Sequence, residues 1–285
     1  MDRFSKFHPI ISFLFFIGII ALTIVFTNSF FTAVSFLCSF CYSVKLKGKK
    51  AVSYLLKFTF PIVLFAGIFN MLFAGYGKHI LFSVKGINFT TECLASGLFT
   101  GVMIGAVIMW FLSYNEIVTS DRFMAIFGGI MPNFALLFSM ILRFIPLMIK
   151  ASDEIKDAHK GLGTETKGLK NTLSRFSALL SISLEKSIET ADSMKSRGFG
   201  TKKRSFYSAY EFRKSDFAAL MLIAVLIIYL FAAGFMEYPQ ISFNPVIEIK
   251  SIHYFSLILF FVYALFPLIA DLSEDVKWLL LKSKI

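Results

Sequence analysis

Apolar segments long enough to cross a lipid bilayer recur from one end of the sequence to the other. A transmembrane helix needs about 20 predominantly apolar residues, and six segments of the 285-residue chain approach or reach this length. With 56% hydrophobic residues and a mean hydropathy of +0.72, the chain has more apolar surface than a water-soluble domain can bury. We therefore predict an all-α integral membrane protein with about six transmembrane helices, at residues 10–26, 30–44, 58–76, 94–113, 217–236 and 252–270.

The 29 Lys and Arg residues are distributed unevenly between the loops that join these segments. With the N-terminus in the cytosol and residues 133–149 entering the membrane without crossing it, 25 of them fall on the inner side and three on the outer side. Membrane proteins place their basic loops in the cytosol in this way. We expect a multi-pass protein of the cell membrane with both termini and residues 150–214 in the cytosol. The net charge of +11 then reflects orientation in lipid, and no nucleic-acid partner is predicted.

Three glycines are spaced four residues apart in the fourth predicted span, at Gly97, Gly101 and Gly105. Residues four apart lie on one face of a helix, and a glycine face lets a second helix approach closely. We predict that this face packs against another helix, in this chain or in a partner subunit. The alternative is a lipid-facing helix that merely tolerates glycine.

The sequence becomes more polar after the fourth span. Residues 121–131 are too short and too amphipathic to cross the membrane. Residues 133–149 are apolar but contain Arg143, close to Pro146. An ionisable group in such a segment is a functional candidate, although its side chain could also reach the inner interface. We divide the chain into residues 1–120 with four spans, residues 121–200 with interfacial and cytoplasmic coupling helices, and residues 201–285 with a basic linker and two spans.

A long amphipathic helix is predicted to end at Gly198. Apolar residues recur every three or four positions before it and form one stripe. The stripe consists of Leu173, Phe176, Leu180, Leu184, Ile188, Ala191 and Met194. Because Gly198 stops the helix, Arg197 lies at the C-terminal end, where the helix dipole favours a cation. An ordinary capping arginine is the alternative to a residue that docks a partner.

Motifs that would indicate catalysis are missing from the sequence. There is no G-x-x-x-x-G-K-[ST] loop for ATP phosphates, and the four histidines are scattered. Cys38 and Cys41 have metal-ligand spacing but lie in an apolar span without a third ligand, so packing is favoured. We predict a protein that is not an enzyme, with no cofactor and no metal site.

Three motifs in the middle of the chain resemble those of a transporter family. They are L-R-F-I-P-L at Leu142–Leu147, I-K-D-A-H-K-G-L-G at Ile155–Gly163 and A-D-S-M-K-S-R-G-F at Ala191–Phe199. The transmembrane T component of energy-coupling factor (ECF) transporters carries an L-R-F-I-P run, then an A-Q-x-A-R-G tip and an A-M-x-[AS]-R-G-[YF] tip. The resemblance extends over about residues 95–220, and Leu162 stands where the first tip of the family has arginine.

The resemblance implies a function that the residues alone do not. In that family the tips dock into grooves on two cytosolic ATPase subunits, and the helices couple ATP hydrolysis to a small membrane subunit that binds a vitamin or a metal ion. It implies coupling roles for Arg143 and Pro146. It implies ATPase docking by Gly161, Leu162, Gly163, Ser196, Arg197 and Gly198.

Two other classes of protein are weighed against a coupling subunit. An integral membrane enzyme acting on lipids needs acids or histidines clustered near the inner interface. Asp153, Glu154 and Asp157 are close together, but with Lys156 and Lys160 they form a typical solvated helix face. A conventional ABC permease with its own substrate path needs polar residues inside its spans, and these spans contain few.

Overall fold

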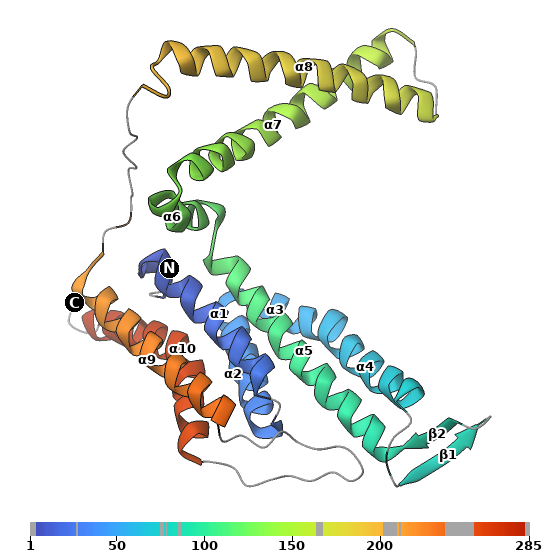
Figure 1. Cartoon of the computed structure of the whole chain (residues 1–285), viewed down its shortest axis with the longest axis vertical. Coiled ribbons are helices and arrows are strands. Elements are labelled where there is room, and N and C mark those ends of the chain that lie inside the picture. The colour runs from blue at the N-terminus through green and yellow to red at the C-terminus, as the bar shows by residue number, and fades with distance from the viewer. Residues whose placement is uncertain are drawn as a thin grey trace. The chain divides into compact units, whose positions relative to one another are not determined.

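The computed structural model describes residues 4–26, 28–74, 77, 79–84, 87–163, 168–201, 210, 212–236 and 254–282. The predicted all-α class is confirmed, because almost all of these residues are helical (Figure 1). The chain forms two compact units, one of residues 1–120 and 210–285 and the other of residues 121–209. The predicted basic linker at residues 202–204 and the loop between the last two spans lie outside the described residues.

The first unit is a bundle of apolar helices. It contains η1 (Phe4–Lys6), α1 (Pro9–Val25), α2 (Ser29–Lys47), α3 (Lys49–Tyr54), η2 (Leu55–Thr59), α4 (Phe60–Phe73), α5 (Thr91–Ile117), α9 (Lys214–Met236) and α10 (Tyr254–Lys282). α5 packs against α1, α2 and α4. α9 lies along α1, and α10 packs against α2 and α9.

The second unit contains α6 (Ser120–Ile130), α7 (Pro132–Gly161) and α8 (Leu169–Ser196). α7 and α8 cross (Figure 1), and the Ser183 hydroxyl lies 2.9 Å from the Met148 sulfur. The same hydroxyl lies 2.7 Å from the Leu179 carbonyl oxygen one turn earlier. A short side chain whose polar group is satisfied within its own helix allows α7 to approach α8 at this point.

Six described helical segments are long and apolar enough to cross a membrane, which agrees with the predicted number. The set differs from the predicted one. α7 belongs to it, because the helix continues without interruption to Gly161 and reaches 30 residues. α1 is equally apolar in character but has 17 residues, slightly fewer than a perpendicular crossing requires.

The basic tract after α2 was predicted to be a loop, and this is wrong for most of it. Only Gly48 separates α2 from α3, and the third span begins at Lys49 instead of Phe58. Gly48 has φ +56°, and its N–H donates to the Val44 carbonyl at 2.7 Å, so the chain turns within one residue. The five residues of η2 form a π-helical turn before Pro61, whose missing N–H requires the helix to adjust its hydrogen bonds.

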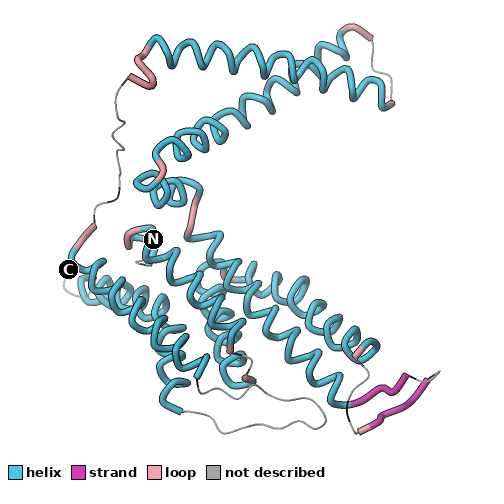
Figure 2. Tube along the Cα trace, viewed as in Figure 1, coloured by secondary structure: helices cyan, strands magenta, loops and turns pink. Residues whose placement is uncertain are grey.

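The segment between α4 and α5 was predicted as a polar loop, but it contains a β-hairpin. β1 (Ile80–Val84) pairs antiparallel with β2 (Ile87–Thr90), with Ile80 opposite Thr90 and Val84 opposite Ile87 (Figure 2). The Thr90 side chain then accepts from the Cys93 N–H at 3.4 Å and caps α5. A two-stranded hairpin outside the helices leaves the overall class unchanged.

Aromatic side chains fill the centre of the first unit. Trp110 of α5 is fully buried and meets Phe15 and Phe16 of α1 at centroid distances of 5.8 and 6.2 Å. Its indole N–H donates to Ser35 Oγ at 3.1 Å, and Ser35 Oγ lies 2.7 Å from Thr23 Oγ1. These bonds join α1, α2 and α5, because a buried polar group in an apolar bundle is stable only with a partner.

Candidate functional site

α7 ends in a glycine-terminated cap. Leu162 is the cap residue, with φ −81° and ψ 0°, and its N–H donates to the Ala158 carbonyl at 3.0 Å. Gly163 follows with φ +65°, a conformation that glycine adopts without steric cost, and its N–H donates to the Lys160 carbonyl at 3.0 Å. The bonds satisfy carbonyls that a helix end otherwise leaves free, so the end is well defined.

α8 ends in the same way. Arg197 is the cap residue, with φ −83° and ψ 5°, and Gly198 follows with φ +81°. The Gly198 N–H donates to the Lys195 carbonyl at 2.9 Å, and the Phe199 N–H donates to the Met194 carbonyl at 3.0 Å. This pair of bonds is the Schellman motif, which fixes both the helix end and the direction in which the chain leaves it.

The two cap positions carry different side chains. Leu162 is 75% exposed, and Arg197 is exposed as well. Two residues before Leu162, Lys160 Nζ lies 3.8 Å from Asp157 Oδ1. Within the described residues, no carboxylate lies at ion-pair distance from Arg197. The first helix end therefore presents an apolar side chain to its surroundings, and the second presents an unpaired guanidinium.

Gly161 and Ser196, the remaining helical residues predicted to dock a partner, are the last residues of α7 and α8. Both are exposed, and a Cβ added at Gly161 would meet no atom of another part of the described chain within 4 Å. The Ser196 hydroxyl donates to the Ser193 carbonyl at 2.9 Å. The six predicted docking residues thus lie at two helix ends, three residues at each.

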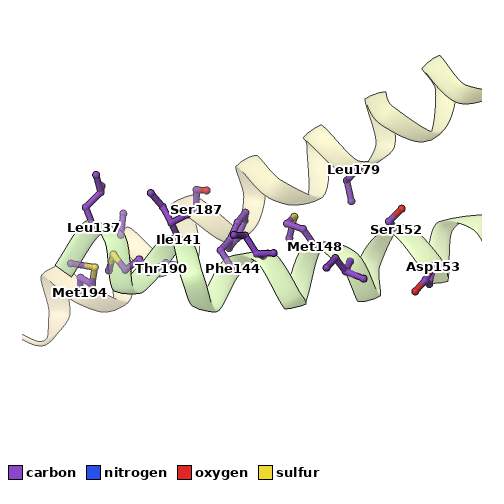
Figure 3. Close-up of a pocket in the computed structure, with 14 residues that line it drawn as sticks. Leu137, Ile141, Phe144, Met148, Ser152, Asp153, Leu179, Ser187, Thr190 and Met194 are labelled. Atoms are coloured by element: carbon purple, nitrogen blue, oxygen red, sulfur yellow. The ribbon is translucent and has the colours of Figure 1, made fainter. Parts of the chain in front are cut away.

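A groove of about 710 Å³ lies between α7 and α8 (Figure 3). Most of its lining comes from α7, and α8 contributes small and flexible side chains. The residues are Leu137, Met140, Ile141, Phe144, Ile145, Met148, Ile149, Ser152 and Asp153 of α7 and Leu179, Ser187, Thr190, Ala191 and Met194 of α8. An apolar groove of this size in a two-helix unit suits docking by an apolar partner.

The predicted apolar stripe of α8 is helical, but it does not pack against α7. Leu173, Leu184 and Ile188 are each more than 60% exposed, and Phe176 and Leu180 are about half exposed. Only its last two members, Ala191 and Met194, line the groove. α8 therefore has an apolar face beyond the one that meets α7, and such a face requires lipid or another protein to cover it.

Arg143 and Pro146 lie on α7 and are exposed. The helix runs continuously through Pro146, whose ring nitrogen cannot donate to the Leu142 carbonyl. Arg143 does not line the groove, although Phe144 and Ile145 beside it do. The structure therefore places these two residues in the middle of α7, well before its end at Gly161.

The three glycines of α5 lie against α4 in the same chain. A Cβ on Gly101 would come within 2.8 Å of Val63 Cα, and one on Gly97 within 2.6 Å of the Ala66 carbonyl oxygen. A Cβ on Gly105 would lie 2.7 Å from Thr59 Cγ2. Real Cβ atoms do not approach other atoms this closely. Gly97 and Gly101 face backbone atoms of α4, so the crossing of α4 and α5 requires glycine at these two positions, whereas Gly105 faces the side chain of Thr59 in η2.

Sequence reasoning missed residues that support this crossing. Gly67 of α4 faces Gly97, with its Cα 2.8 Å from the position of a Gly97 Cβ. Asn70 Nδ2 donates to Ser96 Oγ at 3.1 Å across the same interface. An amide side chain within an apolar span is destabilising unless it has a hydrogen-bond partner. Asn70 was therefore the sequence signal that could have identified the interface between α4 and α5.

Comparisons with known proteins agree with these observations. The sequence profile of the CbiQ family, described as a cobalt transport protein, matches residues 4–207. A relative from Lactococcus lactis subsp. cremoris (strain MG1363), the energy-coupling factor transporter transmembrane protein EcfT, is 28% identical over 204 residues. That match covers 64% of this chain and 75% of the relative.

The chain is therefore a transport component of the membrane and not an enzyme. It belongs to the CbiQ family, because the family profile matches more than half of its length. The predicted resemblance to ECF transmembrane components is confirmed, and the alternatives of a lipid enzyme and a conventional permease gain no support. Among the described residues, no three His, Cys, Asp or Glu side chains are grouped so as to hold a metal ion.

Proposed function

We propose that this chain is the coupling subunit of an energy-coupling factor transporter. It links ATP hydrolysis by two cytosolic ATPase subunits to uptake of a vitamin or a metal ion through a separate, small substrate-binding membrane subunit. The observation that carries the proposal is the pair of exposed, glycine-capped helix ends at Leu162 and Arg197. Ends fixed by their own hydrogen bonds can enter a partner groove without losing conformational freedom.

The groove and the exposed stripe of α8 support a role for the second unit in holding the substrate-binding subunit. Both surfaces are apolar, as expected for contact with a membrane protein. The ends of both helices carry exposed charged residues, such as Lys160 and Arg197, and suit partners in water. α7 and α8 would then link the substrate-binding subunit in the membrane to the ATPase subunits in the cytosol.

The distribution of basic residues supports a cytosolic location for both termini and for the helix ends. A cysteine introduced at Lys282 in a chain without native cysteines is expected to react only from the cytosolic side. Modification of this cysteine from outside intact cells, and not from inside, would contradict the orientation.

Co-purification of ATPase subunits with the tagged chain tests the docking role of Arg197. A guanidinium that meets a carboxylate in a partner groove forms charge-assisted bonds, and removing one side of such a pair costs about 2–5 kcal/mol. We expect Arg197→Ala to lower ATPase recovery by about 30-fold, and Arg197→Glu to lower it further. A capping arginine exposed to water would change recovery little.

Lys186→Glu is the matched control, because Lys186 is an exposed cation on α8 several turns before the cap. It makes the same change of charge on the same helix and is expected to leave recovery unchanged. If Arg197→Glu also keeps full ATPase recovery at matched membrane expression, Arg197 is only a helix cap and the docking proposal is wrong.

A further inference from the structure

The basic tract between the end of α2 and the start of α4 contains five lysines. They are Lys45, Lys47, Lys49, Lys50 and Lys57. The sequence has no Asp or Glu between Asp2 and Glu92, so no acidic residue nearby in the chain offsets these charges. Gly48, with φ +56°, turns the chain within the tract, so the lysines before and after the turn lie at the same end of the bundle.

One carboxylate from another helix reaches the basic tract. Lys47 Nζ lies 3.0 Å from Glu116 Oε2 near the end of α5, and both side chains are partly exposed. Lys49, Lys50 and Lys57 are exposed, and within the described residues no carboxylate lies at ion-pair distance from any of them. The tract therefore keeps most of its positive charge.

The same stretch exposes apolar and aromatic side chains beside its lysines. Val52, Leu56 and Phe58 are between 39 and 59% exposed. The exposed ring of Tyr54 stacks on the Phe58 ring, with centroids 4.6 Å apart. Lysines and a tyrosine among apolar groups are typical of the membrane interface, where the aliphatic stems lie in lipid and the charges reach the headgroups. Lipid covers these apolar side chains, whereas a polar partner in water would leave them uncovered.

The length of the following span places the lysines at the depth of the headgroups. α3, η2 and α4 form one helical stretch of 25 residues, Lys49–Phe73, which is about 37 Å long. The hydrocarbon core of a bilayer is about 30 Å thick, so at least one turn extends beyond it. The far end of the stretch is apolar, with Phe69 and Phe73 both exposed. The end that extends into the headgroup layer is therefore the one with Lys49 and Lys50.

We propose that the basic tract binds the headgroups of anionic phospholipids. The ammonium groups of Lys49, Lys50 and Lys57 meet the negative charges of the lipid, and the acyl chains lie against the exposed apolar side chains of the same stretch. A zwitterionic headgroup carries its own cation and neutralises less of the tract, so the site favours anionic lipid. All the groups involved belong to this chain, so the inference does not depend on the ATPases or on the substrate-binding subunit.

Titration of the purified full chain with phosphatidylglycerol in a neutral detergent tests this site. Native mass spectrometry would measure lipid binding, with phosphatidylcholine of the same acyl chains and soluble glycerol phosphate as comparisons. We expect the chain to prefer phosphatidylglycerol to both. The double variant Lys49→Gln, Lys50→Gln should lower the affinity for phosphatidylglycerol about 25-fold, since each lysine at a headgroup contributes about fivefold.

The matched control for this loss is the double variant Lys156→Gln, Lys186→Gln, which removes two exposed lysines of the second unit. It is expected to leave the affinity unchanged. Equal losses in the two double variants would mean that binding follows net charge alone, and would overturn the site. Equal affinities for phosphatidylglycerol and phosphatidylcholine would also overturn it, as would glycerol phosphate binding as tightly as the lipid.

Glu116→Gln provides an independent test, because a gain in affinity cannot result from misfolding. The change releases Lys47 from its ion pair and is expected to raise the affinity for phosphatidylglycerol about fivefold. Glu154→Gln removes an exposed carboxylate from α7 and is the control, with no expected change. Unchanged affinity with Glu116→Gln, or an equal gain with Glu154→Gln, would contradict a site at the basic tract.

Discussion

The most apolar parts of α5 and α7 are equally hydrophobic, but the two helices are used differently. They have 27 and 30 residues, and their most apolar windows of 18 residues have the same mean hydropathy of 1.9. In α5, 39% of the residues in that window are buried within the protein, whereas in α7 the share is 6%. Hydropathy therefore identifies both as helices for an apolar environment without indicating which of them forms the core.

The spacing of small residues accounts for the difference. α5 has glycines every fourth position, and α4 approaches so closely that no Cβ fits at Gly97 or Gly101. α7 has no glycine before Gly161, and large side chains such as Ile141 and Ile145 project from its surface. We conclude that α5 is held by contacts within the chain, whereas α7 depends on lipid or partners for its apolar contacts.

The largest effect is expected where the close packing of α5 is broken. Gly101→Leu places a side chain where Val63 Cα and the Val63 carbonyl oxygen lie 2.8 and 3.0 Å from the new Cβ. We expect the free energy of unfolding of the bundle to fall by about 3 kcal/mol. Thermal unfolding in detergent is the measurement. Wild-type stability would show that α4 can move away without loss, and that α5 does not depend on this contact.

An effect of intermediate size is expected from a substitution on α7. This substitution should weaken assembly with a partner and leave folding unchanged. Ile141 lines the groove and is 46% exposed, so Ile141→Glu puts a charge in the apolar groove that we propose as a docking surface, without disturbing a core. We expect recovery of the substrate-binding subunit to fall by about tenfold, with thermal stability unchanged.

Leu147→Glu is the control for the groove, since Leu147 is similarly exposed on α7 but does not line the groove. Equal losses for the two variants would mean that a charge anywhere on α7 disrupts its place in the membrane. The groove would then have no specific role.

The contrast between α5 and α7 also explains what the sequence could and could not predict. Period and length predicted the helices, and the position of Gly198 predicted where α8 ends, because these are local properties of the chain. Whether the glycines of α5 pack against this chain or against a partner subunit depends on the tertiary arrangement. The sequence alone therefore left both possibilities open. The stripe of α8 was predicted as one face, but periodicity does not reveal that only its last two members, Ala191 and Met194, line the groove beside α7.

The hairpin and the continuous helical stretch from α3 to α4 were missed for local reasons. A short pair of strands has too few residues for a clear alternation. In the basic tract, charge was used to predict the cytosolic side, and the same charge was also interpreted as a loop between two spans. Lysine is a good helix former, and a single turn at Gly48 is enough to reverse the chain, so charge alone did not define the connection.

The smallest effect concerns pH and the start of α1. The Ile10 N–H donates to His8 Nδ1 at 3.3 Å, and the Phe212 ring lies 4.8 Å from the His8 ring. Burial lowers the pKa of His8 from its ordinary value of 6.5, and the negative charge of Asp216 opposes this shift only in part. The neutral form therefore contributes stability above pH 6.5, and this contribution is lost as the pH falls through the lowered pKa.

We expect a loss of less than about 1 kcal/mol on acidification, because His8 is partly exposed. His8→Asn keeps a capping side chain without a titratable group and should remove this part of the pH dependence. Thermal unfolding of both proteins between neutral and mildly acidic pH is the measurement. Identical pH profiles would show that His8 does not contribute.

ATP-driven uptake in proteoliposomes tests the central claim most directly. The complete complex would contain this chain, its ATPase subunits and its substrate-binding subunit, and accumulation of labelled substrate would be compared for wild type and Arg197→Glu at equal amounts of protein. The account predicts uptake that requires ATP and the ATPases and that falls at least about 30-fold in the variant. Uptake by this chain without ATPases, or full uptake with Arg197→Glu, would contradict a coupling function that acts through the end of α8.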